Sequence, residues 1–191
     1  MDSLTLETKK SIMEDFFCRI DGSRLLDWLE QAGFYKAPAS RGHHGAYVGA
    51  LFDHSLQVTY ELIQFTEKLD LKWEREESPA VVGMLHDVCK MEDYILKREI
   101  IEVKESETIY GDGFWADWNK EGLWCGHGDK SLIMLMGHID LTEEEKACIR
   151  YHMGAFANKE EWEYYTRAVK KYPNVLYTHT ADMLAAHVKG V

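Results

Sequence analysis

Apolar residues along most of this chain recur at steps of three and four, which is the spacing of one face of an α-helix. The clearest run spans residues 47–69, and His54 falls on its apolar face. Because the chain has only three prolines, long helices can form undisturbed. The pattern predicts an all-α chain, with further helices at residues 4–20, 23–32, 78–90, 126–136, 142–152, 159–171 and from 173 onward.

The segment at residues 98–118 does not follow this spacing. Residues 100–103 and 108–110 are rich in β-branched and aromatic side chains, and glycines follow at 111 and 113. This composition predicts a short β-hairpin. Trp115 and Trp118 lie in it, and Trp124 follows, so we expect these tryptophans to pack a lid or hairpin onto the helical core. A stacking surface for a short oligonucleotide is the alternative.

Length and composition indicate one domain. A chain of 191 residues with 46% hydrophobic residues can bury a core of its own. We expect residues 1–191 to form a single unit, with the helices at 4–32 packed on a core that spans about residues 39–187. The formal net charge of −11 argues against binding to duplex nucleic acid, which calls for a basic surface.

The cysteines and the apolar runs bear on the compartment. Four cysteines are dispersed without a CxxC pair, so neither a disulfide framework nor a zinc ribbon is indicated, and a reducing cytoplasm is expected. The N-terminal residues lack the apolar segment of a signal peptide. No apolar run reaches the length of about 18 residues that a membrane span needs, so no membrane association is expected.

Polar residues on the inward faces carry the candidate chemistry. His86 and Asp87 stand side by side at the end of an apolar run, where a buried polar group needs a partner. A single inward histidine is commonly a hydrogen-bonded core residue. Six polar residues spread over five helices instead indicate a metal site, because helical cores bind metals in this way. The candidate ligands are His54, His86, Asp87, His127, His152 and Asp182.

The ordered set resembles the HD-domain superfamily of metal-dependent phosphohydrolases. The sequence Leu-His-Asp-Val-Cys-Lys at residues 85–90 is similar to the family's Leu-His-Asp-Ile-Gly-Lys motif, with Cys89 in place of the common glycine. The segment His-Gly-Asp-Lys-Ser at residues 127–131 resembles the third block of a bacterial and phage subgroup of HD-family hydrolases. The remaining matching segments are residues 51–58, 150–154 and 179–182.

The resemblance implies an HD-domain helical bundle with one or two divalent metal ions such as iron, manganese, cobalt, nickel or zinc, and the presence of His127 and His152 favours two. It assigns the first ion to His54, His86, Asp87 and Asp182. Asp87 would bridge to a second ion, which His127 and His152 would also hold. Cys89 is offset from the inward pair and is not expected to be a ligand.

The implied reaction is hydrolysis of a phosphoester in a small phosphorylated substrate, such as a nucleotide, by a metal-bound hydroxide. Asp87 and Lys90 are the expected catalytic residues, and Lys130 and His44 are the expected substrate contacts. The plain alternative is a solvated surface side chain for the two lysines and a loop histidine without a role for His44. Two rival functions share the same ligand set: a di-iron oxygenase, and a non-catalytic domain that senses a ligand. Lys90 and Lys130 beside the site favour hydrolysis.

Overall fold

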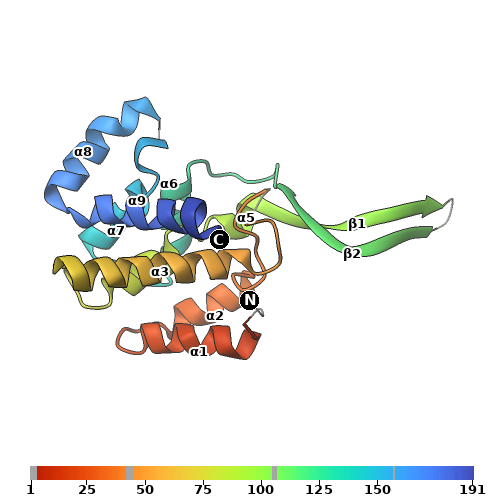
Figure 1. Ribbon diagram of the computed structural model, residues 1–191, viewed down its shortest axis with the longest axis horizontal. Helices are drawn as coiled ribbons and strands as arrows, with labels where there is room; N and C mark the ends of the chain where they lie inside the picture. The colour runs from red at the N-terminus through yellow and green to blue at the C-terminus, as the bar shows by residue number, and fades with distance from the viewer. Residues whose placement is uncertain (1–3, 42–44, 105–106, 157) are drawn as a thin grey trace.

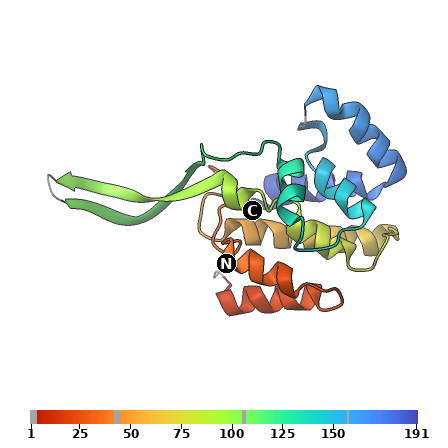
Figure 2. The ribbon, with the colours of Figure 1, turned by 180° about the vertical axis from the view of Figure 1, so that it is seen from behind.

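The computed structural model describes residues 4–41, 45–104, 107–156 and 158–191, and they form a mainly helical body with one two-stranded antiparallel sheet. The prediction of a mainly helical chain is therefore confirmed. The sheet projects from the helical body as a long arm (Figures 1 and 2). None of the helices in the described ranges is long and apolar enough to cross a membrane.

Two helices form the centre of the body, α3 (Ala50–Leu69) and α4 (Ser78–Leu85). Every residue of α4 is buried, and Pro79 lies in its first turn, where a proline is tolerated. The two helices approach closely at Gly83, where a Cβ atom would lie 2.6 Å from the Cα atom of Thr59. Glycine at this point lets α4 lie directly against the α3 backbone.

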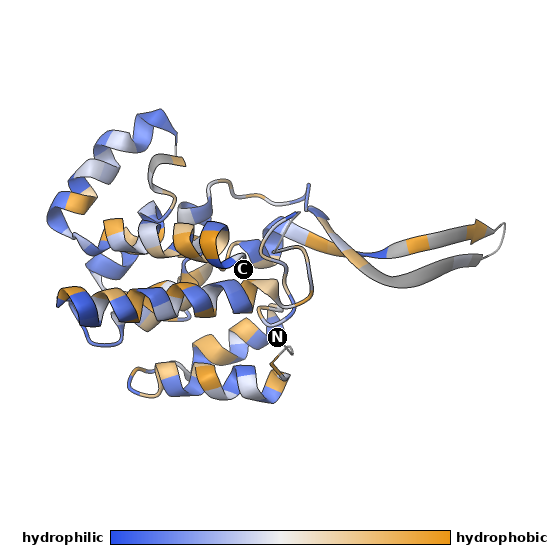
Figure 3. Cartoon of the chain, in the orientation of Figure 1, coloured by the Kyte–Doolittle hydropathy of each residue, from blue (hydrophilic) through white to orange (hydrophobic). Residues whose placement is uncertain are grey.

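Helices α1 (Leu6–Phe17) and α2 (Ser23–Gln31) cover one side of this pair. Their apolar faces enter a core cluster that includes Met13, Phe17, Leu25, Leu29, Phe34, Phe52, Val81 and Leu85. Hydrophobic and hydrophilic residues alternate along these two helices, as Figure 3 shows. The N-terminal helices therefore pack on the central pair.

The other side of the central pair is covered by later helices. They are α6 (His127–Leu135), α7 (Glu143–Tyr151) and α9 (Asn174–Leu184), and α8 (Trp162–Lys171) packs in turn on α7 and α9. Short turns flank them: two 3₁₀ turns (Gly154–Phe156 and Lys159–Glu161) and a π-helical turn (Ala185–Lys189). A second apolar cluster joins α9 and α7 to the central pair, through Val58, Leu62, Val82, Cys148, Val175, Ala181 and Ala185.

The start of α7 is fixed by a buried polar network. Thr142 and Glu145 form a capping box. The Glu145 carboxylate also accepts hydrogen bonds from Arg75 (Nε at 2.7 Å and Nη2 at 2.8 Å) and from Ser78 Oγ at 2.8 Å. Since Ser78 is the first residue of α4, this network ties the starts of two helices together.

The predicted hairpin is present but longer than expected. Strand β1 (Tyr94–Lys104) pairs with β2 (Glu107–Trp118), from Tyr94 opposite Trp118 to Lys104 opposite Glu107. The expectation that its tryptophans pack on the core is wrong. Trp115, Trp118 and Trp124 remain 41–53% exposed, because most of the arm extends away from the helices.

The predicted helix at residues 78–90 is also wrong at its end. Helix α4 stops at Leu85, residues 86–89 form a tight turn, and a short helix α5 (Lys90–Asp93) follows. The backbone hydrogen bonds from Val88 N–H to Leu85 O (3.4 Å) and from Lys90 N–H to Asp87 O (3.0 Å) span three residues, whereas those of an α-helix span four. Such bonds tighten a helix end, and this turn carries the His-Asp pair.

Candidate metal centre

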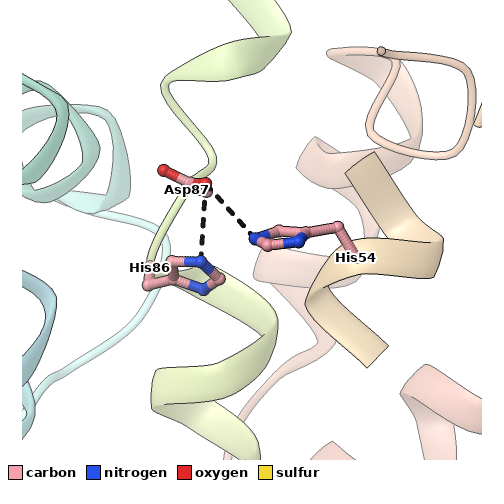
Figure 4. A group of neighbouring side chains, drawn as sticks. All are labelled: His54, His86 and Asp87. Atoms are coloured by element: carbon pink, nitrogen blue, oxygen red, sulfur yellow. Dashed lines mark ion pairs between the residues drawn. The ribbon is translucent and has the colours of Figure 1, made fainter. Parts of the chain in front are cut away.

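The turn after α4 is the meeting point of the metal-binding side chains. His54 reaches it from α3, His127 from the first residue of α6, and Asp182 from α9, while His152 directly follows α7. Figure 4 shows His54 and His86 both directed at the Asp87 carboxylate. The structure therefore brings together side chains that are up to 128 residues apart in the sequence, since His54 and Asp182 lie 3.2 Å from each other.

Asp87 lies at the centre of the group. Its Oδ2 atom is 3.4 Å from His86 Nε2 and 3.7 Å from His54 Nε2, and its Oδ1 atom is 3.3 Å from His152 Nε2. His127 is more distant, with Nδ1 4.0 Å from Asp87 Oδ1. Three imidazoles thus converge on one buried carboxylate.

The three buried imidazoles are oriented in the same way. The Nδ1 atoms of His86, His152 and His54 lie 2.8–3.0 Å from backbone carbonyl oxygens of Gly83, Ile149 and Val191, respectively. A carbonyl can only accept, so Nδ1 carries the proton and, in a neutral ring, Nε2 keeps its lone pair. A backbone carbonyl on the far nitrogen is the usual support of a metal-bound histidine.

The atoms that these rings direct inward are buried without a hydrogen-bond partner. They are His54 Nε2, His86 Nε2, His152 Nε2 and Asp87 Oδ1. The 3.2 Å approach of His54 Nε2 to Asp182 Oδ1 lacks hydrogen-bond geometry. Buried acceptors without partners are costly in free energy, about 1–3 kcal/mol each. A cation between them removes this cost, so the donor set fits a metal ion.

Two groups of ligand atoms are close enough to share an ion. His54, His86 and Asp87 form the first, and Asp87, Cys89 and His127 form the second; within each group the ligand atoms lie within 4.8 Å of one another. Asp87 belongs to both. The chain can therefore hold a metal ion at this centre.

The carboxylates of the centre are held in their charged form. Burial by itself raises the pKa of Asp87, but Lys90 and His86 outweigh it and hold the pKa well below its usual range. Lys90 Nζ lies 2.5 Å from Asp87 Oδ2, and this contact in turn raises the pKa of the ammonium. Burial likewise raises the pKa of Asp182, whereas His54 and His86 lower it below normal. Ionised carboxylates are the form that binds metals.

A cavity of about 620 Å³ opens on this centre. Asp87, Lys90, His127 and Asp182 lie in its wall. Its remaining lining is largely apolar and aromatic, with Tyr94, Met153, Phe156, Met183 and Ala186. The volume falls in the range of small-molecule sites, about 300–1,000 Å³. A ligand in this cavity would touch the metal-binding atoms directly.

Of the two expected substrate contacts, Lys130 does not reach the cavity, and His44 lies outside the described ranges. Lys130 is buried, with its Nζ 2.7 Å from Asp93 Oδ1 and 3.3 Å from Glu92 Oε2, and it is not part of the cavity wall. It ties α6 to α5. His44 lies outside the described residues, although the neighbouring Ser40 and Gly45 line the cavity.

Some residues of the centre were not predicted. Cys89 is fully buried beside Asp87 and His127, although the helical pattern placed it away from them. Asp93 Oδ2 lies 3.8 Å from His127 Nδ1. His179 lines the cavity, and its Nδ1 is 2.8 Å from the His152 carbonyl oxygen. The Cys-for-Gly change in the 85–90 motif was the one available signal for Cys89.

Comparison of the chain with protein-family models, curated proteins and solved structures finds no match.

Proposed function

We propose that this protein is a metal-dependent phosphohydrolase of the HD superfamily, with the family's helical bundle, that cleaves a phosphoester in a small nucleotide-like substrate. The observation that supports it most strongly is the set of three buried imidazoles whose Nε2 atoms lack partners and face Asp87. Each has its Nδ1 on a backbone carbonyl, which is the arrangement of a metal-ligating histidine.

The distances around Asp87 support the ligand assignment that the resemblance implies. The first metal position would be held by His54, His86, Asp87 and Asp182, and the second by Asp87, His127 and His152. Metal ions so placed supply Lewis acidity and a hydroxide nucleophile at neutral pH.

Lys90 supports phosphate chemistry at this position. It lies in the cavity wall beside Asp87, and its ammonium is the nearest cation to the metal-binding carboxylate. With Asp87 bound to a metal ion, the Lys90 ammonium would be free to contact a phosphate oxygen and to balance the charge that develops there. The aromatic and thioether side chains of Tyr94, Phe156 and Met153 offer an apolar surface for a nucleobase or similar ring.

The test is a panel of phosphoesters assayed with metal-loaded protein. Wild type is expected to release phosphate or alcohol, and His86→Ala is expected to lose both metal and turnover. His138→Ala is the matched control, because His138 stacks on Trp28 at a centroid distance of 4.4 Å and is outside the metal centre. Fully loaded wild type that hydrolyses none of the panel, or that consumes O2 with bound iron, would contradict the proposal.

A further inference from the structure

Cys89 occupies an unusual position beside the second group of ligand atoms. Its side chain is 0% exposed, and its Sγ atom lies 3.4 Å from His127 Nδ1. Asp87 Oδ1, which is buried without a hydrogen-bond partner, completes the group within 4.8 Å. Three different donor types (sulfur, nitrogen and oxygen) therefore face one small volume.

The tight turn at residues 86–89 creates this arrangement. The Cys89 backbone N–H donates to Ser131 Oγ on α6, at 3.3 Å. This bond holds the turn against the helix whose first residue is His127. In a continued α-helix, Cys89 would lie nearly opposite Asp87 around the helix axis, whereas the observed turn brings its thiol to the His127 imidazole.

We propose that Cys89 is a further, thiolate ligand of the second metal position, beside the Asp87, His127 and His152 of the proposed function, so that the two positions differ in chemistry. The inference rests on the metal site of the proposed function. The first position offers only nitrogen and oxygen donors, whereas the second also offers sulfur.

The observed distance agrees with shared coordination. Zinc bonds of about 2.3 Å to sulfur and 2.0–2.1 Å to nitrogen, opened at a tetrahedral angle, separate the two donors by about 3.5 Å. The Cys89 Sγ to His127 Nδ1 distance of 3.4 Å is close to this value. Little movement of either side chain is needed to bind an ion between them.

The consequence is a different metal preference at each position. Thiolate favours softer ions such as zinc, cobalt or iron over manganese and magnesium. Binding would break the S–H bond, form the sulfur–metal bond and release the proton to solvent. The second position is therefore expected to take zinc in preference to manganese.

The test uses Co²⁺ and Zn²⁺ as probes on the full-length protein. Cobalt-loaded wild type should show a near-ultraviolet thiolate-to-cobalt charge-transfer band, and zinc-loaded wild type should show a sulfur neighbour at about 2.3 Å by X-ray absorption. Cys89→Ser should lose the band and bind the second ion more than about tenfold more weakly. Loss of a residue that only supports a metal ligand already lowers metal affinity about 10–100-fold. Cys125→Ser (exposed) and Cys148→Ser (buried elsewhere) are the controls and should keep the band.

The outcomes separate this inference from the proposed function. Cobalt-loaded wild type without the band, or Cys89→Ser with an unchanged band, overturns the thiolate ligand; phosphoester hydrolysis in the same sample would leave the proposed function standing. The X-ray absorption measurement needs no variant, so a folding defect in Cys89→Ser does not affect it. Wild type that binds no metal overturns both.

Discussion

Gly83 links the packing of the body to the metal centre. A Cβ atom at this position would lie 2.4–2.8 Å from Oγ1, Cα and N of Thr59, whereas ordinary contact begins at 3.4 Å. Two of these atoms belong to the backbone of α3 and cannot rotate away. The Gly83 carbonyl also accepts the Nδ1–H of His86, at 2.9 Å. Gly83→Ala must therefore push α4 from α3 and carry His86 with it.

The expected change in the free energy of unfolding of Gly83→Ala follows from two opposing effects. Overpacking of a close contact costs about 1–3 kcal/mol, with backbone clashes at the upper end. Alanine has a better helix propensity than glycine, which returns about 1 kcal/mol. We expect the free energy of unfolding to fall by about 2 kcal/mol, which lowers Tm by about 4–8 °C in a chain of this size. Displacement of His86 from His54 should weaken metal binding by about 10–100-fold, as for other disturbed supports of a ligand.

Urea unfolding of the metal-free protein measures the free energy of unfolding, and competition with a chromophoric chelator measures the metal affinity. Gly122→Ala is the matched control, because its Cβ would meet no atom closer than 3.7 Å. It should leave both quantities unchanged. Gly83→Ala with wild-type stability and metal affinity would refute the argument that this contact positions His86.

Three further predictions concern individual charges. Lys90→Ala should lower turnover by about 10²–10³-fold while metal content stays constant, measured by steady-state kinetics and elemental analysis; loss of the metal would contradict its role on phosphate. Arg75→Ala should lower the free energy of unfolding by about 3–5 kcal/mol, because it leaves the buried Glu145 carboxylate without its ion-pair partner, although Ser78 and Thr142 still donate hydrogen bonds to it; a loss below about 1 kcal/mol in urea unfolding would contradict this. The depressed pKa values of Asp87 and Asp182 stabilise the metal-free fold above their unfolded pKa of about 4, and this contribution is lost as pH falls below it. Urea midpoints of EDTA-treated protein should therefore drop between pH 5 and pH 3, and constant midpoints would show that neither carboxylate is stabilised.

The helical periodicity predicted the body of this chain because that signal is repeated over many residues. The 47–69 run appears as α3, and the capping box of Thr142 and Glu145 starts α7. The hairpin was visible in composition. Its projection was not, because composition does not show whether an apolar strand faces a core or solvent.

The sequence pattern could not predict those parts of the metal centre that depend on an irregular turn of the backbone. A helical pattern cannot show that residues 86–89 turn with bonds spanning three residues, so Cys89 was placed on the wrong face. Lys130 shows a second limit. Its ion pair with Asp93 joins residues 37 apart, and a lysine beside a motif looks the same whether it meets substrate or a carboxylate.

The most direct test of the account is the metal content of wild type beside His86→Ala. Both are treated with EDTA, reloaded with a mixture of manganese, iron, cobalt and zinc under reducing conditions, dialysed and analysed by plasma mass spectrometry. We predict two ions per wild-type chain and a large loss in His86→Ala. A wild-type chain that retains no metal, or a variant that retains the wild-type amount, would contradict the central claim that the imidazoles around Asp87 bind metal.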